Sequence, residues 1–154
     1  MDSQALQDYL YRHIPLTRAM QVEVLEAAPN QVRLAAPLSP NINHRDTVFG
    51  GSACAVAIVA AWALLHVRFD TLGVDSRVVI HANTMRYDRP MPGAFTAVAK
   101  APEPASWDRF MRTLERHRRA RIALTSTLFY EGAPAGEMSG EFVAIHPESE
   151  SHPT

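Results

Sequence analysis

The 154-residue chain has a single cysteine, Cys54, and therefore cannot form an intrachain disulfide. A reducing compartment is the natural expectation for such a chain. The first residues, Met1 to Gln4, are polar and acidic and lack the pattern of a signal peptide. We therefore expect a soluble, cytoplasmic protein.

Excess charge and long apolar runs are also missing. The formal net charge is -1, which excludes the global positive field of a nucleic-acid-binding protein, although local basic clusters remain possible. The longest nearly apolar run, residues 52–65, is shorter than the roughly 20 residues that a membrane span needs. We expect neither a nucleic-acid partner nor a membrane span.

The composition that remains is that of a single folded domain. Hydrophobic residues make up 47% of the chain and charged residues 20%, which argues against disorder. The length suits one domain with a real core, and neither a repeat nor an interdomain linker interrupts it. We predict one domain over residues 1–154, with a polar tail from about residue 147.

Hydrophobic periodicity predicts three helices and six strands. Ser3 is the expected N-cap of the first helix, Pro15 its end, and Ser106 the expected cap of the last helix. In chain order, the expected elements are a helix at 3–12, paired strands at 20–27 and 31–38, a helix at 52–67, strands at 77–87 and 94–100, a helix with the apolar stripe Trp107, Phe110, Met111 and Leu114, and strands at 121–130 and 137–145.

The segment 52–67 is apolar on every face and dominated by alanine. A helix that is hydrophobic all round is a buried helix, and small side chains let other elements approach it closely. A single sheet that curls around the helix would cover it on most sides. The fold class is therefore α+β, with six mostly antiparallel strands around one buried helix.

Residues 43–52, Asn-His-Arg-Asp-Thr-Val-Phe-Gly-Gly-Ser, lead directly into this helix and resemble hot-dog-fold thioesterases. The resemblance covers nearly the whole chain and is to the family typified by the C-terminal domain of YiiD. Residues 86–90, and the helix 107–114 that leads into 118–122, are also similar to that family. The resemblance implies a hot-dog fold, in which a curved antiparallel sheet wraps around a central helix.

The resemblance also implies a function. It implies hydrolysis of acyl thioesters, with acyl-CoA or an acyl carrier protein as substrate. It further implies a homo-oligomer, either a dimer or a dimer of dimers, with active sites between subunits. No metal and no organic cofactor is implied, and the histidines other than His44 show no tight metal-ligand spacing.

Gly50 and Gly51 at the helix start are the first candidates for the site. Free backbone N–H groups lie at the positive end of a helix dipole, and without side chains there a thioester carbonyl could approach them. These amides would then stabilise the developing oxyanion. We count Gly51 as catalytic and Phe49 and Gly50 as substrate-binding. The alternative is that the glycines only permit a tight turn and close packing.

Asn43, His44 and Asp46 are the nearby polar side chains able to position or activate water. Many hot-dog thioesterases use a carboxylate on the central helix, but residues 52–67 contain no Asp or Glu. The identity of the base therefore stays open between Asp46 and His44. Each of these loop residues also has a purely structural alternative, such as capping a turn.

Further candidates lie outside this loop. Asn83 and Thr84 belong to the strand whose equivalent reaches the partner's site in hot-dog dimers. The basic residues Arg118, Arg119 and Arg121 could bind the phosphates of CoA or an acidic carrier protein, or could form a solvated edge. Cys54 and Ser52 are better interpreted as a core residue and a helix-start residue than as nucleophiles.

Two other functions remain possible. One is hydratase or dehydratase action on an acyl thioester, which needs a carboxylate–histidine pairing. The other is a non-catalytic acyl-CoA-binding module, which the absence of a helix carboxylate makes plausible.

Overall fold

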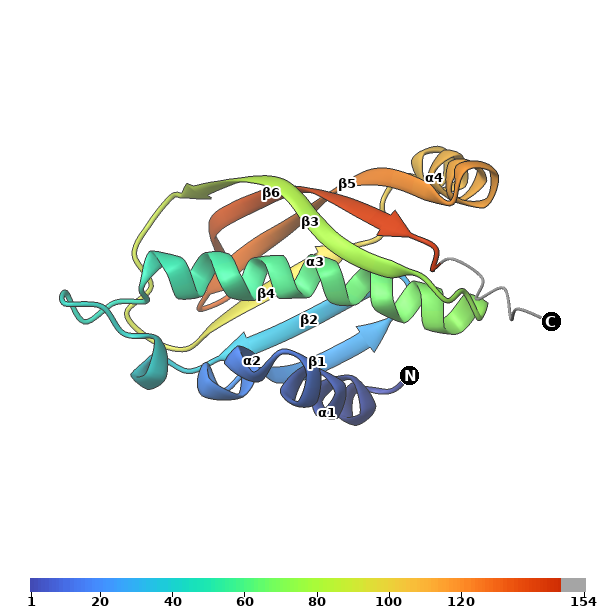
Figure 1. The fold of residues 1–154 in the computed structure, drawn as a ribbon. Helices are drawn as coiled ribbons and strands as arrows, with labels where there is room; N and C mark the ends of the chain where they lie inside the picture. The colour runs from blue at the N-terminus through green and yellow to red at the C-terminus, as the bar shows by residue number, and fades with distance from the viewer. Residues whose placement is uncertain (148–154) are drawn as a thin grey trace.

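In the computed structural model, which describes residues 1–147, one six-stranded antiparallel sheet curls around a long helix (Figure 1). The strand order is β1-β2-β4-β5-β6-β3. The elements are α1 Ser3–His13, α2 Pro15–Ala19, β1 Glu23–Ala28, β2 Gln31–Ala36, η1 Ser39–Asn41, α3 Gly50–Leu72, β3 Arg77–Tyr87, β4 Phe95–Lys100, α4 Pro104–His117, β5 Arg119–Tyr130 and β6 Ala133–Ile145. The predicted α+β hot-dog fold is confirmed.

The central helix α3 is the core of the domain. It contacts all six strands, and most of its alanine, valine and leucine side chains are buried. Gly73 ends the helix in the left-handed conformation, and its N–H donates to the Asp70 carbonyl. Ser126 of β5 donates from Oγ to the Ala57 carbonyl at 2.7 Å, so sheet and helix are also joined by a buried hydrogen bond.

The helix extends further than the predicted span 52–67, because it begins at Gly50 and continues to Leu72. By length and hydropathy α3 could cross a membrane, and it alone meets this criterion among residues 1–147. However, 56% of its most apolar window is buried inside the domain. The apolar character of α3 is therefore accounted for by the sheet around it.

Several predicted boundaries were wrong for local reasons. Asp2, not Ser3, caps α1, because its Oδ1 accepts the Ala5 N–H at 2.8 Å. Pro15 does not only end a helix, since it occupies the first turn of α2, where proline is tolerated. Pro104 has the same position in α4, which places Ser106 inside that helix.

The first strand was also predicted to begin too early, and the last two too late. Met20 follows α2, and Gln21 has a φ of 55°, so the strand starts only at Glu23. Strands β5 and β6 are longer than predicted and meet in a tighter hairpin around Glu131 and Gly132. The extra residues lengthen the sheet over α3.

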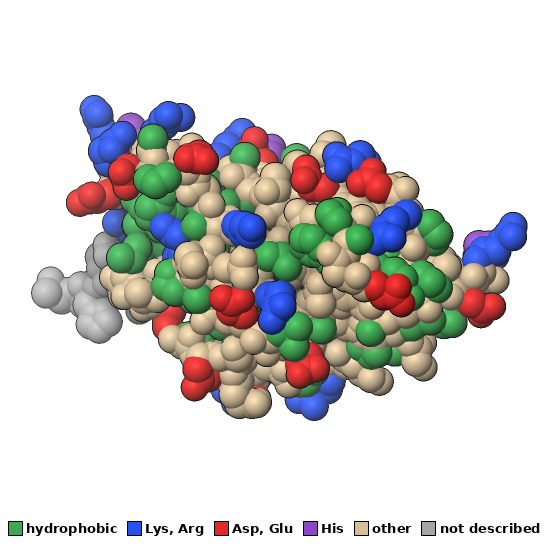
Figure 2. Space-filling model, turned by 180° about the vertical axis from the view of Figure 1, so that it is seen from behind, with side chains coloured by type: hydrophobic (Ala, Val, Ile, Leu, Met, Phe, Trp, Pro, Cys, Tyr) green, Lys and Arg blue, Asp and Glu red, His purple; other side chains and the backbone are tan. Residues whose placement is uncertain are grey.

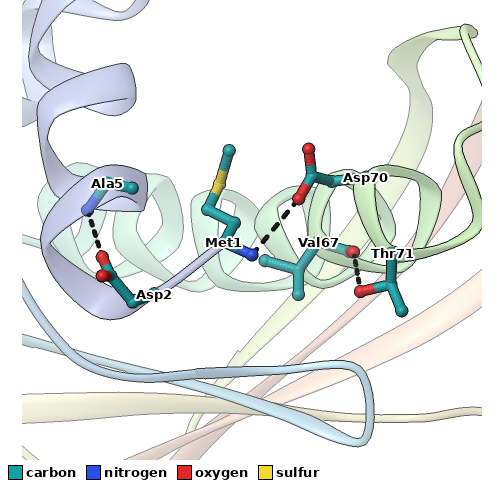
Figure 3. Close-up of polar contacts among 6 residues, drawn as sticks. All are labelled: Met1, Asp2, Ala5, Val67, Asp70 and Thr71. Atoms are coloured by element: carbon teal, nitrogen blue, oxygen red, sulfur yellow. Dashed lines mark hydrogen bonds and ion pairs between the residues drawn. The ribbon is translucent and has the colours of Figure 1, made fainter.

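Helix α1 packs against β1 at one edge of the sheet (Figure 1). Its N-terminus lies beside the C-terminal half of α3 (Figure 3). The Met1 amino group pairs with Asp70 at 3.2 Å, and the Tyr9 ring packs against His66 with a centroid separation of 4.3 Å and a tilt of 33°. Leu6 and Leu10 are buried beneath the helix. One edge of the sheet is therefore covered.

The opposite edge, strand β3, is open. Within residues 1–147 it pairs only with β6, and nearly all of its eleven side chains are exposed, in contrast to the alternating burial of β5. Val79 is 52% exposed and Ile80 36% exposed. A long edge strand with exposed apolar side chains is a template for pairing with another chain.

We predict that Ala57→Leu or Ala60→Leu lowers the free energy of unfolding by about 1–3 kcal/mol, because both side chains are completely buried and larger ones overpack the core. Chemical denaturation measures the change. Ala5→Leu on the exposed surface of α1 is the control and should change it by no more than about 0.5 kcal/mol. Equal stability of all three variants would contradict the burial of α3.

Candidate active site

The start of α3 presents backbone N–H groups that no intrahelical bond uses. The first such bond runs from Ala53 N–H to the Phe49 carbonyl at 3.0 Å, so the amides of Gly50, Gly51 and Ser52 precede it. No side chain among residues 1–147 caps this helix start. The three amides thus lie uncapped at the positive end of the helix dipole.

The helix start is fixed by a residue that sequence reasoning missed. Asn41 is 1% exposed and donates from Nδ2 to the carbonyls of Met20 and Pro37 at 2.9 and 2.8 Å. Its own carbonyl accepts the Phe49 N–H at 2.7 Å. Asn41 therefore ties the residue before α3 to the end of α2 and to the segment after β2. Its place within a polar loop gave no signal of burial.

The two glycines make room for two aromatic rings. A Cβ on Gly50 would lie 3.4 Å from the Tyr87 ring, and a Cβ on Gly51 would collide with the Phe49 ring. Neither glycine has a positive φ, so backbone conformation does not require them. A Cβ would be in ordinary contact with Tyr87 at Gly50, whereas at Gly51 it would displace the exposed Phe49 ring. The alternative that the glycines serve close packing therefore applies to Gly51 and the Phe49 ring, and this packing does not occupy the backbone amides.

Two open hollows, each of about 320 Å³, flank the helix start. One includes Gly50 together with Val48, Tyr87 and Met91. The other includes Gly51 and Ser52 and is walled by the apolar side chains of Leu16, Met20, Pro40, Phe49 and Ala55. The uncapped amides therefore lie between two spaces that a small molecule could enter.

Strand β3 brings polar side chains to the helix start. Asn83 donates from Nδ2 to Cys54 Sγ at 3.5 Å, and the Tyr87 hydroxyl donates to the Gly50 carbonyl at 2.9 Å. Side chains alternate along a strand, so Thr84 points to the opposite face from its neighbour Asn83. The structure thus brings Asn83 to the helix start and leaves Thr84 away from it.

The prediction of Cys54 as a core residue was wrong. Its side chain is half-buried, one turn into α3, and faces β3. The strand over Cys54 is β3, whose own side chains are exposed. The apolar neighbours of Cys54 in the sequence therefore did not imply that Cys54 is buried. No hydrogen bond joins Cys54 to a histidine or a carboxylate within residues 1–147.

The loop before α3 is organised by Asn43. Its Oδ1 accepts the N–H groups of Arg45 and Thr47 at 2.8 and 3.1 Å, and its Nδ2 donates to Thr47 Oγ1 at 2.9 Å. Asp46 has a φ of 60°, as a turn residue does. The polar atoms of Asn43 are therefore engaged within the loop, which supports its structural alternative.

The side chains of His44 and Asp46 are exposed on this loop, which projects beyond the N-terminal start of α3 (Figure 1). Within residues 1–147, neither side chain makes a hydrogen bond or ion pair, and neither contributes to the two hollows. One protomer therefore does not bring these two candidates to the Gly51 amide. Their catalytic roles stay predictions.

The basic residues lie at the other end of the molecule. They follow α4, and Figure 2 shows blue side chains gathered there, away from the loop before α3 at the opposite end. Arg118 donates to the Pro147 carbonyl, and Arg121 pairs with Glu141 at 3.3 Å. Arg119 is exposed at the start of β5. Within one protomer, these arginines are remote from the helix start.

Over residues 1–147, no three or more His, Cys, Asp or Glu side chains are grouped so as to hold a metal ion.

Comparison with known proteins defines the class of this domain and then its family. The family described as "Putative thioesterase (yiiD_Cterm)" matches residues 3–146, nearly the whole chain. The domain is a hot-dog domain of the thioesterase type. The chain belongs to the family typified by the C-terminal domain of YiiD.

Solved structures agree over most of the chain. A protein of unknown function from Chlorobaculum tepidum is 26% identical, with a TM-score of 0.88 and 94% of each chain covered. A "putative thioesterase" from Shewanella oneidensis is also 26% identical, with a TM-score of 0.80, covering 94% of this chain and 97% of its own. A thioesterase from Haemophilus influenzae, at 11% identity and a TM-score of 0.75, shares the fold, with 99% of this chain and 96% of its own covered.

We predict that Asn43→Ala loosens the loop, because the amides of Arg45 and Thr47 lose their acceptor. Their hydrogen exchange should accelerate by up to about tenfold, as expected for hydrogen bonds of about 0.5–1.5 kcal/mol. Arg45→Ala, which removes an exposed side chain and keeps the hydrogen bonds of both amides to Asn43, is the matched control. Unchanged exchange in Asn43→Ala would show that the loop is ordered by other contacts.

Proposed function

We propose that this protein hydrolyses acyl thioesters of coenzyme A or of an acyl carrier protein. The observation that carries the proposal is the uncapped start of α3 between two hollows. Membership in a thioesterase family supports the same reaction class.

In the proposed reaction, the thioester carbonyl oxygen accepts hydrogen bonds from the amides of Gly51 and Ser52. Water adds to the carbonyl carbon, and the negative charge that develops on the oxygen is stabilised by these donors and by the helix dipole. The carbon–sulfur bond then breaks, and the products are a carboxylic acid and a free thiol. Asp46 and His44 are the proposed candidates for accepting the proton of the water.

We further propose that the working unit is a homodimer, formed through the open edge of β3. Pairing of two copies about a two-fold axis would cover both edges with backbone hydrogen bonds. The two copies of β3 would then run antiparallel, so the Arg77 end of one would lie beside the Tyr87 end of the other.

This arrangement gives the basic residues a role that one protomer does not. Arg77 and Arg119 both pair with Ile145, so the start of β5 lies two strands from the Arg77 end of β3. Adjacent strands are about 4.8 Å apart. In an antiparallel dimer, Arg118, Arg119 and Arg121 of one protomer would therefore approach the helix start of the other, where they would bind the phosphates of CoA or an acidic carrier protein. A cytoplasmic location suits these substrates.

The reaction is tested by incubating the protein with acyl-CoAs of several chain lengths and types. Release of free thiol means hydrolysis, altered unsaturation means hydratase or dehydratase chemistry, and binding without turnover means a non-catalytic module. The proposal expects free thiol and carboxylic acid in equal amounts. Either of the other outcomes contradicts it.

Gly51→Ala tests the oxyanion site directly. Gly51 lacks a positive φ, so alanine adds no left-handed strain, but its methyl group displaces the exposed Phe49 ring beside the amides. We expect turnover to fall by about 100-fold or more, comparable to the loss of one oxyanion donor. Asp46→Asn should lower it by about 100- to 10,000-fold and remove the acidic limb of the pH–rate profile if Asp46 is the base.

His44→Ala is the comparison, because the acidic limb should disappear there instead if His44 is the base. Melting curves establish that each variant is folded before its rate is interpreted. Folded Gly51→Ala and Asp46→Asn proteins with full activity would show that the site lies elsewhere.

The shared-site proposal predicts complementation between two defective protomers. One protomer has Arg118, Arg119 and Arg121 changed to Gln, and the other carries Gly51→Ala. If the arginines act on the partner's site, a mixed dimer has one intact site and should recover about half of the wild-type activity at low substrate concentration. If they act within their own protomer, mixing recovers nothing. Sedimentation must show a dimer, and a stable monomer at micromolar concentration contradicts the proposal.

A further inference from the structure

Tyr87 lies at the end of β3 and contacts the first residue of α3. Its hydroxyl donates to the Gly50 carbonyl at 2.9 Å, and its ring lies 3.4 Å from the position that a Cβ of Gly50 would occupy. The residue as a whole is 55% exposed. Core packing therefore does not account for this tyrosine, and its hydroxyl is aimed at one particular carbonyl.

That carbonyl belongs to the same peptide unit as the Gly51 N–H. Because a peptide unit is planar, a bond that fixes the direction of its C=O also fixes the direction of its N–H. By helix geometry, the Gly50 carbonyl also accepts the Cys54 N–H, and its second lone pair is available to Tyr87. Hydrogen bonding to the C=O also polarises the peptide, which makes its N–H a stronger donor.

The end of β3 that carries Tyr87 is held on the β5–β6 hairpin. The N–H groups of Asp88 and Arg89 both donate to the Ala135 carbonyl, at 3.0 and 3.2 Å. The Arg89 guanidinium donates to the carbonyls of Pro134, Tyr130 and Ala133 at 3.0 Å each. Tyr87 therefore reaches α3 from a rigid base.

The Tyr87 hydroxyl carries its proton at neutral pH and can therefore donate a hydrogen bond. Partial burial, together with a smaller contribution from Cys54, raises the pKa of Tyr87 above its ordinary value. The phenol is consequently protonated at neutral pH, and it donates because the carbonyl can only accept.

We propose that Tyr87 is a positioning residue, which orients and polarises the Gly50–Gly51 peptide so that the Gly51 N–H points at the thioester oxygen. This inference rests on the proposed thioesterase function, and it adds to the proposed site a side chain that acts on the backbone amides. Tyr87 acts through the peptide and does not touch the reacting atoms.

Tyr87→Phe tests the proposal, because it removes the hydroxyl and keeps the ring against Gly50. We expect kcat to fall about three- to tenfold, the equivalent of one ordinary hydrogen bond, with KM and the melting temperature unchanged. A merely structural role would lower the melting temperature without this separation of kcat from KM. Unchanged kcat, or a rise in KM alone, overturns the proposal.

Tyr130→Phe is the matched control. The Tyr130 ring likewise lies against a glycine, Gly93, but its hydroxyl bonds to Glu131 and not to the helix start. The same loss of a phenol hydroxyl should leave kcat unchanged. An equal fall of kcat in both variants would contradict a specific role for Tyr87.

A second measurement does not depend on turnover. In the uniformly labelled protein, Tyr87→Phe should shift the NMR resonances of the Gly50 carbonyl carbon and the Gly51 amide nitrogen, and Tyr130→Phe should not. Unshifted resonances overturn the positioning role even if the protein is an active thioesterase. A wild-type protein that releases no thiol from any acyl-CoA overturns the proposed function instead, while the resonances still report whether Tyr87 sets the peptide.

Discussion

The burial of α3 within one curled sheet is the constraint on which the rest of the structure depends. A helix that is apolar all round must be covered, and six antiparallel strands achieve this from one layer. A single open sheet has two edges. Helix α1 covers the β1 edge, and the β3 edge is exposed. Within residues 1–147 no side chain caps the start of this helix, so its first amides have no intrahelical or capping partner. The candidate site and the proposed dimer interface follow from the same packing solution.

The alanine content predicted the central helix, because small side chains in a buried helix let neighbouring strands approach its backbone closely. The prediction held because Ala57 and Ala60 face the sheet and are completely buried. Cys54 lies on the same helix but beneath the exposed strand β3, so its apolar neighbours did not imply burial. The local sequence pattern identifies a buried helix, whereas the burial of each face of that helix depends on which strands the topology places over it.

The helix start at Gly50 and Gly51 was predictable, since a helix start after a polar loop is visible in the sequence. The contributions of Asn41 and Tyr87 were not, because each depends on a contact between segments far apart in the chain. Asn41 reaches back to Met20, and Tyr87 reaches Gly50 from 37 residues away. An asparagine in a loop and a tyrosine in a strand can each have many structural roles, and the sequence alone does not identify the contact that each makes in the folded chain.

The central claim is that the amides at the start of α3 hold the thioester oxygen. The most direct measurement is a crystal structure of the protein with an acyl-CoA analogue in which a methylene group replaces the thioester sulfur, giving a ketone that water cannot cleave. The account predicts the ketone oxygen at about 2.7–3.1 Å from the Gly51 amide nitrogen, with the acyl group in one of the two flanking hollows. A ketone bound elsewhere, with the Gly51 amide facing solvent, would contradict it.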